Sequence, residues 1–234
     1  MRGPLVAFLL LGWVLGSSPA AIAQEADQRA TVLHLGQSAE RTLLRDLLRV
    51  ELRVEESGAD PRAVQSAINR RMAAALDRAR PTEGVRAETG AYHVGEERPP
   101  NRAATWRGSQ SLILKSKNAE TTLKLVGMLQ SDGLVMSSLS YEVSPETLRN
   151  AQDDLTAEAL AAVGRRAASI AEATHLAVLR YRDLRVGNVE TEGRPVPRFS
   201  GAAMAAGAPP VAEPGEAVVR VTIEAELLLG QPRT

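Results

Sequence analysis

Few side chains in this 234-residue sequence have the types and spacing that metal ligands or acid–base catalysts usually show. There is no cysteine, and the three histidines, His34, His93 and His175, lie far apart. A zinc site needs three or four converging ligands, and no His-x-x-x-His pair supplies two of them from one helix. His34 and His93 could meet Asp46 across a sheet, which is the metal site that the sequence leaves open. We expect ordinary polar positions there instead, with no metal and no cofactor.

Covalent catalysis also lacks its usual sequence patterns. An activated serine needs a neighbouring base, and neither a Gly-x-Ser-x-Gly turn nor a Ser-x-x-Lys pair occurs. Ser109 and Ser111 precede Lys115, but this stretch is more typical of a strand. Glycine-rich phosphate-binding loops do not occur either. The sequence therefore predicts no catalytic residues and a protein that is not an enzyme.

Trp106 is the residue that the sequence singles out as a candidate contact. Tryptophan is enriched among the residues that dominate binding energies, so Trp106 could anchor a ligand or another subunit. It could also pack in the core from a strand, and we favour core packing. The other aromatic residues after position 23 are scattered, which argues against a stacking surface for sugars or bases; they are Tyr92, Tyr141, Tyr181 and Phe199.

Alternating residues predict the strands that must position these side chains. Val50, Leu52 and Val54 alternate with charged residues, which places them on one face of a strand. Residues 31–36 are expected to form its hairpin partner. Further strands are predicted at 85–94, 104–117, 134–143 and 184–189, the last after an irregular segment at 176–183. A final strand at 219–227 must return to an existing sheet, because a lone strand is unstable.

Capping residues and apolar spacing predict three helices. Asp60-Pro61 begins the first, in which apolar residues recur every four positions from Val64 to Leu76. Asn118 caps a short second helix. Ser144-Pro145 begins a long alanine-rich helix that runs to about residue 173. Its buried side is predicted at Leu148, Ala151, Leu155, Ala159, Ala162 and Ile170.

This order of elements predicts an α+β fold, with antiparallel sheets, helices packed on one face and the C-terminal strand returning to the sheet. Residues 190–216 contain five prolines and four glycines and lack periodicity. We expect them to form a mobile loop within a single domain over 24–234.

The N-terminus is typical of a secretory signal peptide. Arg2 precedes an apolar run over 5–15, and Ala21-Ile22-Ala23 is a small-x-small cleavage pattern. We therefore expect cleavage after Ala23. The apolar run is well short of the ~20 residues that a spanning helix needs. The remaining chain is expected to be soluble and, in a bacterium, periplasmic.

The charge balance after residue 23 indicates no polyanionic partner. Residues 1–23 contain one base and no acid, so 27 of the 28 bases and all 28 acids remain. A nearly neutral surface favours neither nucleic acid nor an anionic membrane as a partner. No later stretch is long and apolar enough to span a membrane.

Several strings, taken in order from about residue 31 to 229, resemble the SIMPL-domain proteins, a group of exported bacterial proteins. Leu35-Gly36 stands where that family has a serine-glycine step in its first strand. Asp46 matches the aspartate of a Pro-Asp step, with Arg45 in place of the proline. Asn69-Arg70-Arg71-Met72 resembles the middle of the first helix.

The later strings are similar to the same family. Trp106-Arg107-Gly108-Ser109 stands where a tyrosine-centred strand motif is usual, and Ser144-Pro145-Glu146-Thr147-Leu148 resembles the entry to the long helix. His175 occupies a position where a helix-ending glycine is common. Residues 195–214, with the strand after them, resemble the C-terminal end of the family.

The resemblance implies a periplasmic location, with peripheral outer-membrane association in some members, and a link to envelope or oxidative stress. It also implies homo-oligomers and gives no agreed catalytic residues. The leading hypothesis is a non-enzymatic protein that acts through self-assembly or contacts with an envelope protein. The alternative is a module that binds a small molecule or lipid, with 190–216 as a lid. A third, an unrecognised hydrolase or redox enzyme, would have to use Asp46, His34 or His93.

Overall fold

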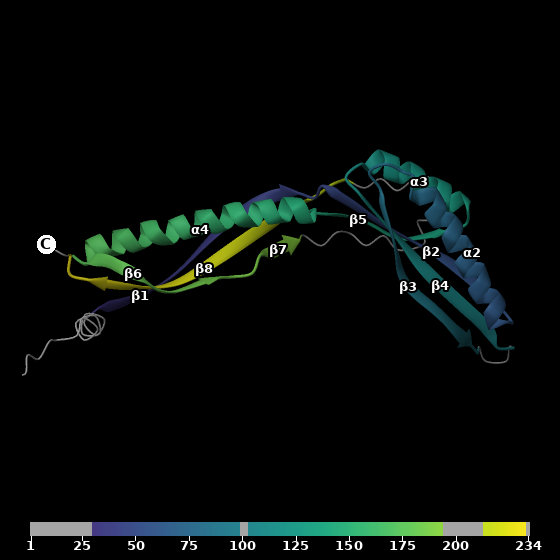
Figure 1. Ribbon diagram of the computed structural model, residues 1–234, viewed down its shortest axis with the longest axis horizontal. Helices are drawn as coiled ribbons and strands as arrows, with labels where there is room; N and C mark the ends of the chain where they lie inside the picture. The colour runs from purple at the N-terminus through teal and green to yellow at the C-terminus, as the bar shows by residue number, and fades with distance from the viewer. Residues whose placement is uncertain (1–29, 99–102, 194–212, 233–234) are drawn as a thin grey trace, which may run out of the picture. The chain divides into compact units, whose positions relative to one another are not determined.

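The computed structural model describes residues 30–98, 103–193 and 213–232. Within them lie three α-helices and two antiparallel sheets, as the sequence predicts for an α+β fold (Figure 1). The elements are β1 (Thr31–Leu44), β2 (Leu47–Gly58), α2 (Pro61–Ala79), β3 (Arg86–Glu97), β4 (Thr105–Ser116), α3 (Ala119–Ser131), β5 (Val135–Glu142), α4 (Pro145–Ala173), β6 (Ala177–Val186), β7 (Glu190–Gly193) and β8 (Glu216–Gly230).

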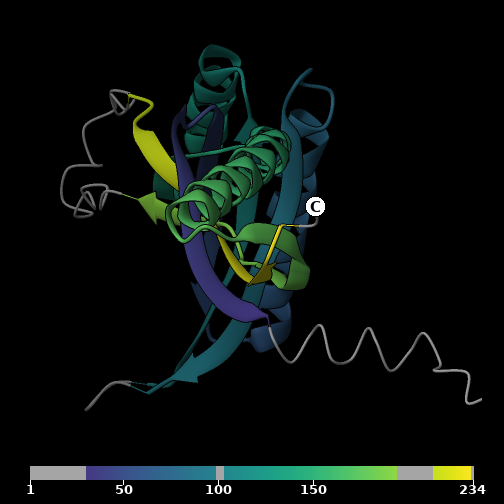
Figure 2. The ribbon, with the colours of Figure 1, turned by 90° about the vertical axis from the view of Figure 1, so that its left-hand side faces the viewer.

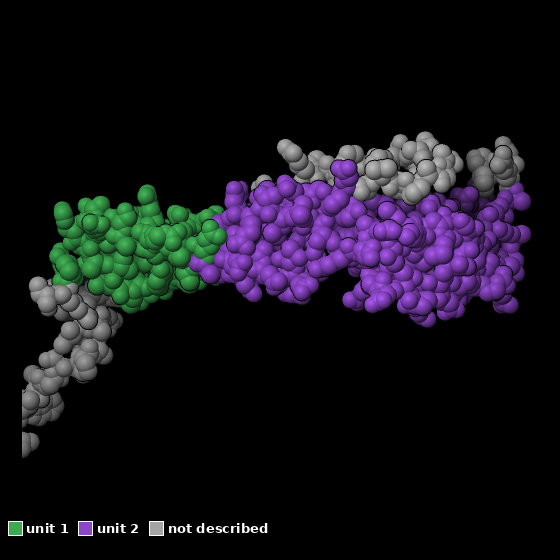
Figure 3. Space-filling view, turned by 90° about the horizontal axis from the view of Figure 1, so that it is seen from above, with its two compact units in different colours: residues 1–38, 158–187, 222–234 green, residues 39–157, 188–221 purple. Residues whose placement is uncertain are grey.

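The chain forms two compact units, which Figure 3 shows in different colours. Unit 1 comprises residues 1–38, 158–187 and 222–234. Unit 2 comprises residues 39–157 and 188–221. Both are built from segments that lie far apart in the sequence, so neither could be recognised as a continuous stretch of chain.

Unit 2 contains a four-stranded sheet in the order β3-β4-β2-β5. The chain passes through it as β-α-β-β-α-β, and both helices pack on one face, which is the ferredoxin-like arrangement. The buried side chains between sheet and helices include Val50, Leu52, Ile68, Leu112, Leu114, Leu125 and Leu129. The residues of β2 that alternate with them, such as Arg49 and Glu51, lie on the uncovered face of the sheet and form ion pairs there.

The caps of α2 and α3 are those that the sequence predicts. The Asp60 carboxylate accepts a hydrogen bond of 3.0 Å from the backbone N–H of Arg62, and Pro61 occupies the first turn of α2. Asn118 accepts from the N–H of Thr121 at 3.1 Å at the start of α3. Each side chain satisfies an N–H group that the helix leaves unpaired, so local chemistry alone locates these helix starts.

Gly108 on β4 lets α2 approach the sheet closely. A Cβ atom at this position would lie 2.5 Å from Cδ1 of Ile68 and 2.9 Å from Cγ2 of Val94. Any larger residue would therefore have to displace a core side chain. The glycine of the Trp106-Arg107-Gly108-Ser109 string thus has a packing role.

The second sheet has the order β1-β8-β6, and β7 also pairs with β8. Figure 1 shows α4 lying along this sheet, and Figure 2 shows the same helix nearly end-on. In unit 1, the side chains of β8 from Ile223 to Leu229 are mostly buried, as are those of Val163, Ala167 and Ala171 of α4. Small residues on α4 allow this close contact between helix and sheet.

The predicted hairpin between residues 31–36 and β2 is wrong. β1 pairs with β8, whereas β2 lies between β4 and β5. The Ser38 and Thr222 hydroxyl groups lie 3.0 Å apart across the β1–β8 pair although 184 residues separate them in the sequence. Alternation shows which side chains share a face, but it does not identify the partner strand.

The segment predicted to be irregular, 176–183, belongs largely to strand β6. Its register against β8 shifts between Val178 and Arg180 and again between Tyr181 and Asp183. Two β-bulges therefore break the alternation by which a strand is recognised. The expected loop over 190–216 is also shorter, because its first four residues form β7 and Glu216 begins β8; residues 194–212 lie outside the described part of the chain.

The buried side of α4 differs in part from the prediction. Ala151, Leu155 and Ala159 are buried as expected, but the stripe continues through Val163, Ala167 and Ala171. The predicted Leu148, Ala162 and Ile170 are half-buried. An alanine-rich helix is weakly polar on several sides, so the sheet it packs on decides which side is buried.

Candidate functional site

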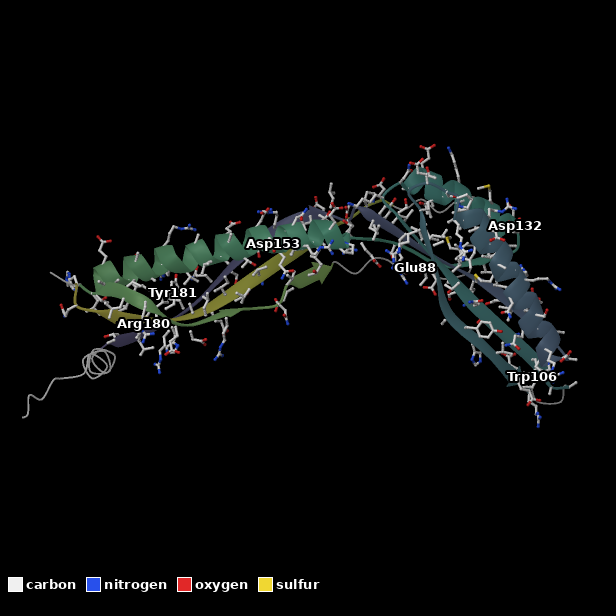
Figure 4. All side chains as sticks on the ribbon, in the orientation of Figure 1. Glu88, Trp106, Asp132, Asp153, Arg180 and Tyr181 are labelled. Atoms are coloured by element: carbon white, nitrogen blue, oxygen red, sulfur yellow. The ribbon has the colours of Figure 1, made fainter. Side chains whose placement is uncertain are left out.

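Trp106, the predicted contact residue, lies near the start of β4 (Figure 4). Its neighbours in the sheet are Gly58 of β2 and Glu96 of β3. The side chain is half-buried and packs against the hydrophobic core of unit 2. This position agrees with the core-packing interpretation and leaves part of the indole exposed.

The three residues of the candidate metal site do not form one cluster. His34 lies on β1 in unit 1, whereas His93 and Asp46 belong to unit 2. Within unit 2, His93 is opposite Ser109 at one part of β4, and Asp46 precedes the pair of Leu48 with Ser116. Seven residues of an extended strand separate these positions by ~23 Å. Among the described residues, no group of three or more His, Asp and Glu side chains is placed to hold a metal ion.

Ser109 and Ser111 of β4 lie on the uncovered face of the unit 2 sheet. Ser109 is between His93 of β3 and Glu55 of β2 in the strand register. Glu55 pairs with Arg53 at 2.5 Å, and within the described part of the chain the Ser109 hydroxyl makes no hydrogen bond to His93. A serine nucleophile needs a base in hydrogen-bond contact, so this row lacks the arrangement of a catalytic serine.

Asp46 forms the most connected polar cluster among the described residues. Its carboxylate accepts hydrogen bonds from the Ser144 backbone N–H at 2.7 Å and from the Ser144 hydroxyl at 2.8 Å. The Thr147 hydroxyl donates at 2.9 Å, and Nζ of Lys117 lies 3.1 Å away. These groups come from the β1–β2 turn, the link from β4 to α3, and the first turn of α4.

The charge state of Asp46 follows from these contacts. Burial would raise the pKa of its carboxyl group, but the hydrogen bonds from Ser144, Lys117 and Thr147 outweigh burial and hold the pKa far below its ordinary value. The same contact raises the pKa of Lys117. Because its acceptor sites are filled by the start of α4, Asp46 acts as an anchor for that helix. This role accounts for the aspartate in the family-like string.

Arg71, from the Asn69-Arg70-Arg71-Met72 string, has a similar structural role. Its guanidinium donates to the carbonyl oxygens of Asp132 and Gly133 at 3.3 and 2.7 Å and to the Glu56 carboxylate at 2.5 Å. The two carbonyl groups belong to the turn that follows α3. Arg71 therefore fixes α2, β2 and this turn to one another.

Each unit has an open hollow on a sheet face, formed by described residues. The larger, about 370 Å³, lies in unit 1 and is lined by residues of β1, β6 and β8, among them His34, Gly36 and Glu224. The smaller, about 140 Å³, lies in unit 2 beside His93 and Arg107. Both are lined mainly by charged and polar side chains from sheet faces.

A row of apolar side chains on β6 is left open to solvent. It consists of Val178, Tyr181, Leu184 and Val186, which are 38 to 52% exposed. In the β6–β8 ladder, Leu184 lies opposite the buried Ala225, and the other three residues also face buried residues of β8. Opposed residues of an antiparallel pair point to the same face, so this β6 apolar row lies on the side of the sheet that α4 covers.

The helix covers β8 but reaches only the near side of β6. Figure 4 labels Tyr181 on β6 next to α4, and its hydroxyl oxygen lies 3.8 Å from where a Cβ atom of Gly164 would be. Leu160, one turn before Gly164 on α4, is 37% exposed. One helix is about 10 Å wide, which is also about the distance between the axes of the two outer strands of a three-stranded sheet. The outer side of an edge strand therefore extends beyond the helix, and its apolar side chains stay partly exposed.

Sequence reasoning missed this row. Its members recur at intervals of three, three and two residues, because each β-bulge adds one residue to the ordinary interval of two. The sequence shows apolar residues at 178, 181, 184 and 186, but their spacing matches neither a regular strand nor a helix. A register with two bulges would have been needed to place them on one face.

The fold and these surfaces define an α+β protein built from a ferredoxin-like unit and a helix-covered sheet with an exposed apolar edge. The model of the SIMPL family, described as a protein of unknown function (DUF541), matches residues 35–227, and the chain belongs to this family. No curated protein sequence matches the chain. Within the described residues, no helix is long and apolar enough to cross a membrane.

Proposed function

We propose that this SIMPL-family protein is a non-enzymatic exported protein that acts through self-assembly or protein–protein contacts. The observation that carries the proposal is the β6 apolar row. Large apolar side chains gathered on one edge of a soluble domain favour a binding surface, because covering them with another protein removes apolar area from water. The family match is compatible with this role and assigns no activity.

The contacts of the polar clusters support a role in holding the fold together rather than a role in catalysis. Asp46 is the described group whose pKa departs most from its ordinary value, and its bonds are directed at the start of α4. Perturbed groups often mark catalytic sites, but ion-pair networks that hold a fold together perturb them as well. Asp46, Ser144 and Lys117 form a network of the second kind.

The proposed location is the periplasm. The support is the sequence pattern of residues 1–23, with a positive residue, an apolar run and a small-x-small cleavage pattern. The SIMPL resemblance adds peripheral outer-membrane association and a role in envelope or oxidative stress defence to this proposal. An envelope protein is then the natural class of foreign partner.

The proposal predicts that the purified protein is an oligomer. Light scattering coupled to size-exclusion chromatography at micromolar concentration should give a mass that is a multiple of the monomer mass. Apolar contacts tolerate salt, so the mass should stay unchanged when the salt concentration is raised. A strict monomer under all of these conditions would contradict self-assembly.

A ligand-binding role is the second candidate, and the hollow beside Gly36 is the observation that favours it. The charged lining of this hollow fits a polar small molecule better than a lipid. Most of the proposed lid, 190–216, lies outside the described part of the chain, at residues 194–212. A ligand that prefers the folded state should raise the melting temperature in a screen of envelope metabolites, and no shift with any compound would count against this role.

A further inference from the structure

Strand β6 lies at one edge of the β1-β8-β6 sheet, and only part of it is regular. The two register shifts involve residues 178–183, whereas Asp183, Leu184, Arg185 and Val186 pair with β8 without interruption. Bulges on an edge strand hinder pairing with other strands. The segment from Asp183 to Val186 is therefore the part of β6 that remains suited to strand addition.

The four residues of this segment divide between the two faces of the sheet. Leu184 and Val186 lie on the face of α4 and are 43 and 52% exposed. Asp183 and Arg185 lie on the opposite face, where their side chains pair with each other at 2.9 Å and stay largely exposed. An apolar face and a charge-paired face are thus both presented along one edge, beside which the described part of the chain places no further strand.

We propose that β6 pairs with β6 of a second copy of this chain, antiparallel and centred on Leu184. This inference rests on the proposed self-assembly and names its surface. In this register Leu184 lies opposite Leu184 of the second copy. Asp183 lies opposite Arg185 of the second copy, and Arg185 opposite its Asp183. Strand addition at an open edge then provides backbone hydrogen bonds as well as side-chain contacts.

The charges select this register from its neighbours. A shift that centres the pair on Arg185 places two arginines opposite each other, and one centred on Asp183 places two carboxylates together. Registers centred between residues place apolar side chains of this segment opposite charged ones. Like charges directly opposite each other destabilise a strand pair, whereas opposite charges stabilise it. Of these registers, the two-fold centre at Leu184 is thus the one that places Leu184 opposite Leu184 and Asp183 opposite Arg185.

The pairing would also cover the surface that α4 leaves open. The side chain of Leu184 would gain Leu184 of the second copy as an apolar neighbour, which removes both side chains from water at the axis. An interface with this symmetry uses the same patch on both copies and closes on itself as a dimer. Larger assemblies would then need a second surface.

A single-cysteine variant tests the symmetry directly, because the chain has no cysteine of its own. In Leu184→Cys, the two thiols would face each other across the axis. Cα atoms of opposed residues in antiparallel strands lie ~4.5–5.5 Å apart, which suits a disulfide. Under mild oxidation we expect most of the protein to run as a covalent dimer on non-reducing gels and as a monomer after reduction.

Val32→Cys is the matched control, since Val32 has similar exposure, 40%, and lies on β1 at the other edge of the same sheet. It should remain largely monomeric on the same gels. Efficient cross-linking of Val32→Cys without cross-linking of Leu184→Cys would overturn the inference in favour of the β1 edge. Circular dichroism would establish that both variants keep the native helix content.

Charge reversal gives an independent test in solution. Asp183→Arg or Arg185→Asp alone places like charges across both symmetric pairs and should weaken the dimer by roughly tenfold. The double variant Asp183→Arg/Arg185→Asp restores opposite charges and should recover most of the affinity. Assembly that persists unchanged in all three variants, without cross-linking at Leu184, overturns this interface but leaves self-assembly standing. A protein that is monomeric throughout overturns both.

Discussion

Asp46 shows how a single side chain fixes the relation between distant segments of unit 2. It accepts hydrogen bonds from the backbone and hydroxyl of Ser144 and from Thr147, and it pairs with Lys117. These partners follow Asp46 by 71 to 101 residues in the sequence. Removing the carboxylate would leave buried donors at the start of α4 without a partner, so its contribution to stability should be large for one residue.

The first prediction concerns Asp46→Asn, which should lower the free energy of unfolding by about 2 kcal/mol at pH 7. The folded state holds the pKa of Asp46 below the ordinary value of 3.8, so its stabilisation is complete above about pH 4 and is lost as the pH falls through the folded-state pKa. The difference between the variant and the parent should therefore shrink in acid. Urea denaturation at pH 7 and pH 3 would measure it.

Asp154→Asn is the matched control for this experiment. Asp154 also pairs with a cation, Arg41 at 2.8 Å, but its side chain is 63% exposed. An exposed ion pair contributes little to stability, so this variant should differ from the parent by less than about 0.5 kcal/mol. An equal loss in both variants would mean that Asp46 acts only as a general surface charge.

His175 has a specific role that depends on its backbone conformation. It ends α4 with a φ of 57°, in the left-handed region that favours glycine. The N–H groups of Leu176 and His175 donate to the carbonyls of Ala171 and Glu172, which is the hydrogen-bond pattern of a Schellman helix end. The geometry expected of a helix-ending glycine is thus present without the glycine.

His175→Gly should therefore stabilise the protein. A residue with a side chain is strained in the left-handed region, and glycine relieves that strain at some cost in unfolded-state entropy. We expect a net gain of about 0.5–1 kcal/mol, seen as a higher melting temperature by calorimetry. A lower melting temperature would show that the imidazole makes a stabilising contact that outweighs the strain.

At the scale of elements, the contact between α2 and the unit 2 sheet depends on Gly108. Gly108→Val would insert a branched side chain where even a Cβ atom lies 2.5 Å from Cδ1 of Ile68. We expect a loss of about 3 kcal/mol in unfolding free energy by chemical denaturation, because overpacking displaces core side chains. Gly127→Ala is the control: this glycine lies in α3 with open space around its Cβ position, so alanine should stabilise by up to about 1 kcal/mol.

A substitution at Trp106 distinguishes core packing in unit 2 from assembly through unit 1. Its indole packs on the core, so Trp106→Ala should lower the melting temperature, with a cost of about 2–3 kcal/mol for a half-buried side chain. The assembled mass by light scattering should not change. A variant with native stability but altered mass would instead place Trp106 in the contact surface.

At the scale of the whole molecule, the prediction concerns cleavage of the chain during export. When the full chain is expressed in a Gram-negative bacterium, the protein recovered from the periplasm should begin at Gln24, with a mass lower by residues 1–23. Intact-mass spectrometry of the periplasmic fraction would measure this. Recovery of the uncleaved chain in the membrane fraction would contradict cleavage after Ala23.

The sequence by itself determined the starts of the helices, the positions of most strands and the α+β class. These features depend on neighbours along the chain, such as Asp60 and Asn118 as caps and the alternation of Val50, Leu52 and Val54. Ordered local strings also indicated the SIMPL family, which the family model confirms. Short-range geometry limits each of these choices, so a few residues suffice to show them.

Only the tertiary structure decided which strands pair and which surface stays open. β1 pairs with β8 instead of β2, and the bulges of β6 place Tyr181, Leu184 and Val186 on one face. The Asp46 carboxylate contacts Ser144 and Lys117 rather than a histidine. These outcomes depend on the free edges and faces of elements far away in the sequence, because pairing and burial energies arise between strands and not within them.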